Sequence, residues 1–230
     1  YTMSASAIAP LFYGGIPVFA DIEEDTYCLD PKSVEAKITP RTKAIIVVDI
    51  FGQPYDVDAI NAIAKKHNLK VIEDAAQAPG AKYGEKFAGT LGDIGIFSLN
   101  YHKHIHSGEG GIMVTDDDKL ADKLQLIRNH AESVIANKGF ESVQVLVNMV
   151  GFNFSMTEIE AAIAREQLKK LPLLLEQRIK NVSYLNEELK KLEFIKTTKI
   201  RANCVHSFYV HPLELDAAKV GVHRDRFNGR

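Results

Sequence analysis

The chain has 230 residues, which can bury a sizeable core and could form one large domain or two small ones. Its 28 basic and 30 acidic residues give a net charge of −2, so the composition indicates no polyanionic partner such as nucleic acid. No apolar run approaches the roughly 20 residues of a membrane span, and no signal peptide is visible. We therefore expect a cytoplasmic protein without a membrane partner, in which Cys28 and Cys204 are unpaired thiols.

The first third of the chain alternates helical and strand patterns. Residues 3–13 are small and apolar without charge, which predicts a buried helix that ends at Gly14 and Gly15. The patterns that follow predict a strand over 16–21, a helix over 31–38, a strand over 43–50, a helix over 57–67 and a strand over 69–73. Strand, helix and strand within about thirty residues form a βαβ unit, which indicates an α/β fold with a mostly parallel sheet.

The second half of the chain is richer in helix. Residues 116–130 and 156–171 have helical periodicity, Pro172 is expected to interrupt the second helix, and residues 173–192 predict another. Residues 131–150 have no clear period and predict a long loop. Short strands are expected over 193–199 and 207–213. We thus expect a large domain over residues 1–171, and a linking helix with the start of a smaller domain over 172–230.

Residues 71–111 combine three strand-like runs with polar residues at the ends of those runs. The runs cover 71–74, 94–98 and 112–115, and glycine-rich or small-residue turns separate them. Ligands of α/β sheets bind at the ends of strands. This stretch is therefore the predicted functional site.

Three motifs in this stretch carry a family resemblance. They are E-D-A-A-Q-A from Glu73, G-T-L-G-D-I-G-I-F-S from Gly89, and K-H-I-x-x-G-E-G-G from Lys103. In this order and spacing they resemble the DegT/DnrJ/EryC1/StrS aminotransferases, pyridoxal 5′-phosphate (PLP) enzymes that mostly act on nucleotide-linked keto sugars. The resemblance spans nearly the whole chain and implies a fold-type I PLP-dependent transferase. It implies a mostly parallel sheet of the seven-stranded type flanked by helices, plus the start of a smaller α/β C-terminal domain. Family members extend beyond both ends of this sequence, so the chain looks like an interior piece of a longer protein.

The resemblance assigns the chemistry to two residues. Lys103 matches the family's lysine that forms an imine with the cofactor aldehyde, and the neutral amine is its nucleophilic form. Asp74 matches the carboxylate that keeps the cofactor's pyridine nitrogen protonated, which makes the ring an electron sink. Taken alone, a lysine is usually a solvated surface charge and an aspartate at a strand end is often a helix cap. The motifs around them favour the catalytic assignment for both.

Four further residues are expected to bind the cofactor. Gln77 could reach its phenolic oxygen or ring face, and Ser98 with neighbouring N–H groups suits its phosphate. Met3 stands where the family usually places an aromatic residue that stacks on the ring. Asn153 lies in a region that in the family reaches the phosphate of the neighbouring subunit's cofactor, although many members have arginine where Ser155 stands.

Three histidines and a glutamate near Lys103 leave their roles open. His102, His104 and His106 alternate along an extended segment, but no carboxylate or cysteine completes a metal-ligand set, so we expect no metal. One of them could contact substrate. Glu109 lies between glycines that allow a tight turn, and its expected role is structural.

The sequence thus favours an aminotransferase that passes an amino group from an amino acid, by resemblance glutamate, to a keto sugar. The resemblance also implies a homodimer with shared active sites. Family members that dehydrate deoxysugars replace the lysine with histidine, so Lys103 argues against dehydration. Two alternatives remain: another small-molecule transaminase or an aminoshikimate-type synthase on the same fold, and a non-catalytic protein that binds PLP or a sugar nucleotide.

Overall fold

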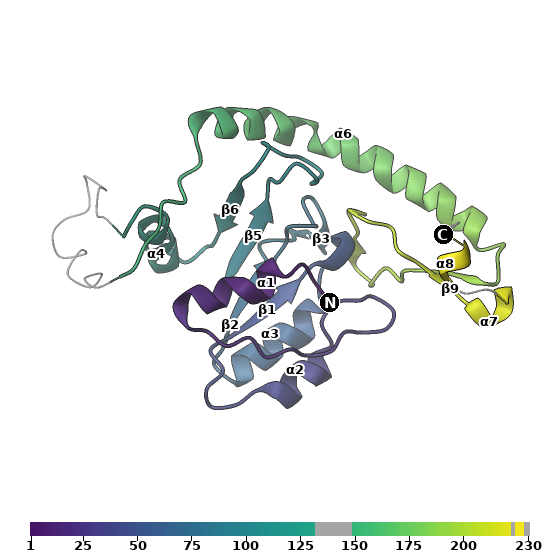
Figure 1. The fold of residues 1–230 in the computed structure, drawn as a ribbon, viewed down its shortest axis with the longest axis horizontal. Coiled ribbons are helices and arrows are strands. Elements are labelled where there is room, and N and C mark those ends of the chain that lie inside the picture. The colour runs from purple at the N-terminus through teal and green to yellow at the C-terminus, as the bar shows by residue number, and fades with distance from the viewer. Residues whose placement is uncertain (132–148, 222–223, 228–230) are drawn as a thin grey trace.

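A four-stranded sheet forms the centre of the computed structural model, which describes residues 1–131, 149–221 and 224–227 (Figure 1). The strands lie in the order β1 (Ala44–Val48), β2 (Lys70–Asp74), β5 (Ile94–Ser98) and β6 (Gly111–Val114). β1, β2 and β5 are parallel, whereas β6 runs antiparallel to β5 at the edge. The predicted α/β fold with a mostly parallel sheet is confirmed; in the described residues this sheet has four strands rather than seven.

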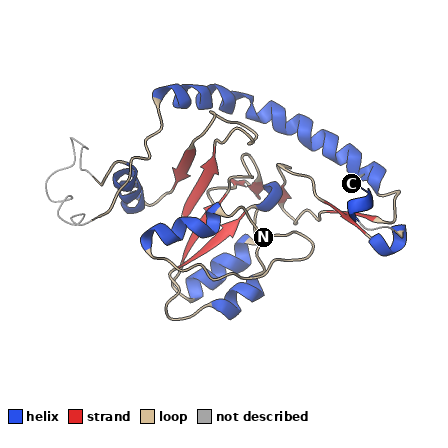
Figure 2. Cartoon of the chain, viewed as in Figure 1, coloured by secondary structure: helices blue, strands red, loops and turns tan. Residues whose placement is uncertain are grey.

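Helices α2 (Pro31–Lys37) and α3 (Val57–Lys66) begin where the sequence predicts and pack on the sheet (Figure 2). Asp30 and Asp56 cap them, since each carboxylate accepts a hydrogen bond from a first-turn N–H. Apolar side chains of both helices join those of β1 and β2 in the main core: Val34, Ile45, Val47, Tyr55, Ile60, Ala64 and Val71. The βαβ prediction is therefore confirmed.

Helix α6 (Glu158–Leu189) is continuous, so the predicted interruption at Pro172 is wrong. Proline removes one N–H donor from the helix ladder, but Leu171 and Leu175 on either side of it are buried against Leu99 and Ile105. This packing stabilises the helix through the proline. The expected boundary between residues 171 and 172 falls inside α6, and the division into two domains stays a prediction. In the described part of the chain, no helix has both the length and the hydropathy needed to cross a membrane.

The N-terminal segment differs from the prediction. Residues 3–13 form two short helices, α1 (Ala5–Ile8) and the 3-10 helix η1 (Ala9–Tyr13), and their apolar side chains are exposed rather than buried. The predicted strand over 16–21 is wrong, because the segment pairs with no strand among the residues that the structure describes, and Ile16 is 84% exposed. Pro17 lacks the N–H that a sheet ladder requires.

The C-terminal region contains short elements. β7 (Ile195–Thr197) confirms the strand expected over 193–199, whereas the strand predicted over 207–213 is wrong except at its last residue, which begins β9 (Leu213–Leu215). The helix expected over 116–130 is confirmed as α4 (Asp118–Arg128), and most of the loop expected over 131–150 lies outside the described residues. The remaining elements are η2 (Ile50–Gly52), β3 (Lys82–Tyr83), β4 (Lys86–Phe87), β8 (Cys204–Val205), α7 (Ala217–Val220) and α8 (Arg224–Phe227).

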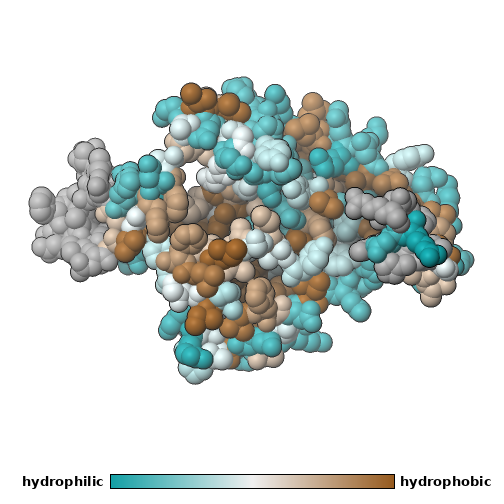
Figure 3. All heavy atoms as spheres, viewed as in Figure 1, coloured by the Kyte–Doolittle hydropathy of each residue, from teal (hydrophilic) through white to brown (hydrophobic). Residues whose placement is uncertain are grey.

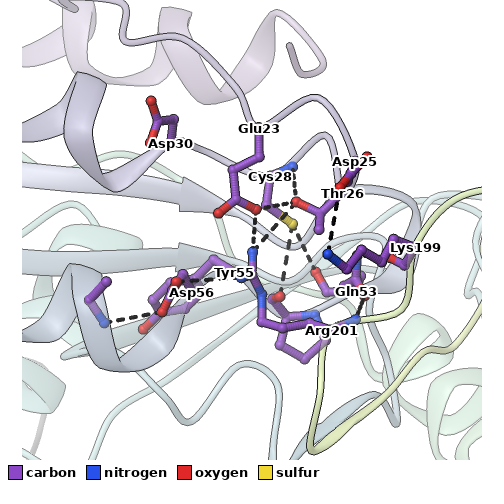
Figure 4. Close-up of polar contacts among 12 residues, drawn as sticks. Glu23, Asp25, Thr26, Cys28, Asp30, Gln53, Tyr55, Asp56, Lys199 and Arg201 are labelled. Atoms are coloured by element: carbon purple, nitrogen blue, oxygen red, sulfur yellow. Dashed lines mark hydrogen bonds and ion pairs between the residues drawn. The ribbon is translucent and has the colours of Figure 1, made fainter.

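Polar contacts attach the C-terminal region to the sheet domain (Figure 4). The buried side chain of Gln53 accepts a hydrogen bond from Arg201 N at 2.6 Å and donates one to Lys199 O at 3.1 Å. The Arg201 guanidinium contacts Glu23 at 2.5 Å and Asp56 at 3.4 Å. Because these groups are largely shielded from water, the contacts fix the position of the backbone at Lys199 and Arg201 against the sheet domain.

Candidate active site

Asp74 ends the central strand β2, at the carboxyl edge of the sheet. Its Oδ2 accepts a hydrogen bond from Ser6 Oγ at 2.6 Å, and its Oδ1 accepts one from Ala76 N at 3.1 Å. The side chain is only partly buried. Asp74 is therefore a fixed carboxylate that keeps acceptor capacity for a ligand. The sequence reasoning missed Ser6, which comes from α1.

Glu73 points to the opposite face of the strand, where it is completely buried. Its carboxylate accepts hydrogen bonds from Gly89 N at 2.7 Å, Leu91 N at 2.8 Å and Gly92 N at 3.2 Å. These bonds hold the turn between β4 and β5. The sequence reasoning treated this glycine-rich turn as a family motif and missed its partner Glu73.

Gly95 lets that turn lie directly on β5. A Cβ atom at Gly95 would stand 1.8 Å from Gly89 O, so only glycine fits without moving the backbone. Gly89 itself has a φ of +87°, which other residues rarely adopt. The motif from Gly89 to Ser98 thus has a packing explanation that requires no ligand.

Asp49 is a second buried carboxyl group beside Glu73. Its Oδ1 accepts a hydrogen bond from Tyr55 N at 3.0 Å, whereas its buried Oδ2 has no hydrogen-bond partner among the described residues. If both carboxyls were ionised, Oδ2 would have no donor. Burial, and then the negative charge of Glu73, raise the pKa of Asp49 well above its ordinary value. This shift favours the protonated form of Asp49, whose O–H could then donate to the Glu73 carboxylate.

Lys103 follows β5 on a short loop and is partly buried. Its Nζ lies 4.7 Å from the centre of the Tyr209 ring. Burial lowers the pKa of Lys103, whereas the nearby negative charge of Asp74 opposes that shift. The structure therefore places Lys103 and Asp74, the two predicted catalytic residues, close enough for the charge of Asp74 to act on the Lys103 amine.

Hydrogen bonds stabilise the loop that carries Lys103. Ser98 Oγ accepts from Asn100 N at 3.3 Å at the end of β5. Asn100 Nδ2 donates to Glu109 Oε1 at 2.8 Å, and Ser107 Oγ donates to Glu109 O at 2.7 Å. Glu109 thus closes the loop, in agreement with its expected structural role, and Ser98 lies at the same sheet edge as Asp74.

Gln77 contacts a backbone segment in an unusual conformation. Its Oε1 accepts a hydrogen bond from Phe51 N at 2.6 Å, so its Nε2 is the group that could donate to a ligand. Phe51 has a φ of 59°, in the left-handed region that a bulky residue seldom occupies. Such strain is held only where the surrounding contacts enforce it, and it concentrates at functional sites.

The other two predicted cofactor residues lie at the surface. Met3 is 67% exposed just before α1, in the segment that brings Ser6 to Asp74. Asn153 is exposed and pairs with Asn129, at the end of α4. Ser155, two residues on, is exposed as well. Within one copy of the chain, the contacts of Asn153 run to α4 rather than to Lys103.

His104, His206 and His211 lie close to Tyr209. His104 Nε2 lies 3.0 Å from Ser207 O, and His206 Nδ1 accepts a hydrogen bond from Phe208 N at 2.8 Å. Burial, and then the charges of His211 and His104, together lower the pKa of His206 to about 3, so the neutral ring is its favoured form at pH 7. The sequence reasoning singled out His104 but missed His206, His211 and Tyr209. In the described residues, no group of histidine, cysteine or acidic side chains is arranged to hold a metal ion.

Solved structures with this fold are PLP-dependent aminotransferases of the fold-type I class and their relatives. DesI, solved in the presence of its TDP-sugar product, matches with a TM-score of 0.86 and 32% identity over 98% of this chain and 55% of its own. The E. coli GDP-4-keto-6-deoxy-D-mannose-3-dehydratase, solved with bound hydrated PLP, matches with a TM-score of 0.83 and 31% identity over 96% of this chain and 59% of its own.

The model of the DegT/DnrJ/EryC1/StrS aminotransferase family matches residues 1–229, and the chain belongs to this family. GDP-perosamine synthase of Caulobacter vibrioides is 42% identical over 191 residues, which are 83% of this chain and 50% of that protein. The spore coat polysaccharide biosynthesis protein SpsC of Bacillus subtilis is 35% identical over 97% of this chain and 58% of its own length. The chain thus spans little more than half the length of these relatives.

Proposed function

We propose that the protein containing this chain is a PLP-dependent aminotransferase. It transfers an amino group from an amino acid, with glutamate the expected donor, to a nucleotide-linked keto sugar. The observation that carries this proposal is the partly buried amine of Lys103 within the electrostatic influence of the Asp74 carboxylate, which ends β2 at the carboxyl edge of the sheet. Both residues stand within the motifs of an aminotransferase family.

The donor set fits PLP. When bound, PLP supplies an aldehyde that an amine can attack and a ring that withdraws electrons once its nitrogen is protonated. Asp74 would hold that ring nitrogen, because Ser6 and Ala76 fix its carboxylate and leave acceptor capacity. Lys103 would bond the aldehyde carbon through Nζ. A carboxylate and an amine of lowered pKa on one sheet edge are the groups this cofactor requires.

The other predicted cofactor residues take supporting roles in this proposal. Gln77 Nε2 would donate to the phenolic oxygen, and Ser98 Oγ would join nearby N–H groups at the phosphate. Met3 would pack on the ring face. Asn153 would reach the phosphate site of a partner subunit, which agrees with its exposed position in a single chain.

Lys103 would also move the proton of the reaction. Its neutral amine would take a proton from the substrate carbon and later give it back, acting first as base and then as acid. Burial favours the neutral amine, since it lowers the pKa of Lys103. Asp74 stabilises the charge that develops on the ring during this transfer.

The relatives support a sugar substrate. GDP-perosamine synthase is named for a nucleotide sugar, and DesI was solved in the presence of its TDP-sugar product. SpsC is named as a protein of spore coat polysaccharide biosynthesis. Dehydratases of this family replace the site lysine with histidine, and the chain has Lys103 at that position. We therefore place the protein in amino-sugar or polysaccharide biosynthesis as an aminotransferase.

We also propose that the protein is a homodimer with shared active sites. Apolar side chains gather on the face formed by α1 and η1 (Figure 3). Within this N-terminal segment Leu11, Phe12 and Tyr13 are each more than half exposed, and Phe154 near Asn153 is 62% exposed. Exposed apolar surface of this kind marks an interaction site. A second copy of the chain is the occupant that brings Asn153 to a cofactor.

The test uses full-length protein incubated with PLP. We expect a visible absorption band, and after borohydride reduction a phosphopyridoxyl group on Lys103 by peptide mapping. With glutamate and a nucleotide-linked keto sugar, mass spectrometry should show the aminated sugar. Lys103→Ala is the matched control and should lose both the adduct and the turnover.

An adduct on Lys82 or Lys86, or no adduct, would overturn the assignment of Lys103. Turnover in the Lys103→Ala variant at the wild-type rate would do the same. Sedimentation of the same preparation at micromolar concentration tests the dimer, and an active monomer would contradict it.

A further inference from the structure

The segment His206–His211, called here the crossing segment, passes over the site. Ser207 N donates to Gly52 O at 2.8 Å, and Tyr209 N donates to Phe51 O at 2.8 Å. From α6, Arg178 donates to Phe208 O at 3.0 Å. These bonds join three parts of the chain that are distant in sequence, so the position of the segment over the site is strongly determined.

Backbone strain occurs on both sides of this contact. Phe51 has a φ of 59° and Phe208 has a φ of 50°, both in the left-handed region that is unfavourable for phenylalanine. Both side chains are buried. Because Phe51 O accepts the Tyr209 N–H, the two strained residues fix the backbone next to Tyr209.

Tyr209 is the residue of the crossing segment that meets Lys103. The Lys103 amine lies over the ring face at 4.7 Å from its centre, and the His104 ring lies 5.6 Å from the same ring. The negative face of an aromatic ring attracts an ammonium group, and the attraction grows when water is excluded. The charged or titratable groups around the amine are Asp74 on β2 and His104 on its own loop.

We propose that Tyr209 is a positioning residue for Lys103, whose ring face holds the lysine amine whenever that amine is not bonded to the cofactor. This inference rests on the proposed function, because only a lysine that alternates between bonded and free states needs such a holding site. The ring has two effects. It fixes the direction of the free amine. It also stabilises the ammonium form of Lys103 and so opposes the effect of burial, which favours the neutral amine.

A second lysine provides a matched comparison. Lys82 Nζ lies 4.7 Å from the centre of the Phe87 ring, the same distance as in the Lys103 pair. Phe87 is 51% exposed, so water screens that contact. The two pairs have the same amine-to-ring distance in different surroundings, and of the two only the Lys103 pair adjoins the site.

The test compares Tyr209→Phe with Tyr209→Leu in full-length protein freed of cofactor. Brief labelling with an amine-reactive anhydride over a range of pH, followed by peptide mass spectrometry, reports the neutral fraction of Lys103. Rates are normalised to their plateau at high pH. Tyr209→Phe keeps the ring face and should match the wild type. Tyr209→Leu keeps an apolar cover and should raise the neutral fraction at pH 7 by about 5- to 30-fold.

Phe87→Leu is the control, and it should change the labelling of Lys82 by only about 2- to 5-fold. In the loaded enzyme, Tyr209→Leu should change kcat more than KM, because the free lysine acts after substrate binding. The inference would be overturned if the neutral fraction of Lys103 were unchanged or lower in Tyr209→Leu, or if Tyr209→Phe changed it as much as Tyr209→Leu does. If wild-type Lys103 never bonds PLP, the proposed function fails instead, whatever the Tyr209 variants show.

Discussion

Two neighbouring carboxylates at the end of β2 have opposite environments. Glu73 faces the core, is completely buried and accepts three backbone N–H bonds. Asp74 faces the site, is partly buried and accepts one hydroxyl and one N–H. The alternation of side chains along a strand places them on different faces although they are adjacent in sequence.

The difference separates the structural acid Glu73 from Asp74, the acid proposed to act on the cofactor. The three N–H donors around Glu73 use most of the acceptor capacity of its carboxylate, and buried Asp49 lies beside it. Little of that capacity is left for a ligand. Asp74 is oriented by Ser6 but keeps room for another donor. The number of donors around a buried carboxylate therefore indicates which member of such a pair meets substrate.

The largest effect is expected from Glu73→Ala in full-length protein. It leaves the N–H groups of Gly89, Leu91 and Gly92 unpaired, at about 1–3 kcal/mol for each buried donor. The total approaches the whole stability of a typical domain, about 5–15 kcal/mol. Urea unfolding measures the loss. Glu85→Ala, on an exposed turn, is the control and should unfold like the wild type; similar curves for both variants would show that Glu73 is not structural.

Asp74→Asn should have the complementary effect. The shape and the Ser6 contact can persist, so the free energy of unfolding should change little. Transamination should slow by about 10²–10³, because the amide no longer holds the ring nitrogen protonated. Single-turnover kinetics measures the proton-transfer step. A near wild-type rate would show that Asp74 is not the partner of the ring nitrogen.

Asp49→Asn is expected to have the smallest effect near pH 4, and its effect should grow as the pH rises. The amide can still accept from Tyr55 N, and its Nδ2 can donate to Glu73. Because the folded-state pKa of Asp49 is raised, the folded wild type keeps a proton that the unfolded chain releases above about pH 3.9. The wild type should therefore lose stability relative to the variant as pH rises above that value, by up to about 1.4 kcal/mol per pH unit.

Unfolding free energies at pH 4, 6 and 8 measure this difference. Parallel pH profiles of the wild type and Asp49→Asn would show that Asp49 is already ionised in the folded protein.

The sequence predicted the sheet and its edge well, because apolar runs and helical periodicity report burial within one chain. Lys103 and Asp74 were predicted from motifs, and the structure brings them together. Tyr209 was not predicted, because it follows Lys103 by more than a hundred residues and belongs to no strand or motif. Local patterns also failed at Pro172, where packing of Leu171 and Leu175 outweighs the lost hydrogen bond, and at residues 16–21, which have no pairing strand in the described part of the chain.

The amide of Gln53 has a consequence for the order in which the protein matures. This side-chain amide bonds to the backbone of Lys199 and Arg201, which are 146 and 148 residues further along the chain. During synthesis, a nascent chain that ends before them leaves this otherwise buried amide without those bonds, and it also lacks Tyr209. Such a chain already contains Asp74 and Lys103 but not the crossing segment, so the residues of the sheet edge are made before the residue that positions Lys103.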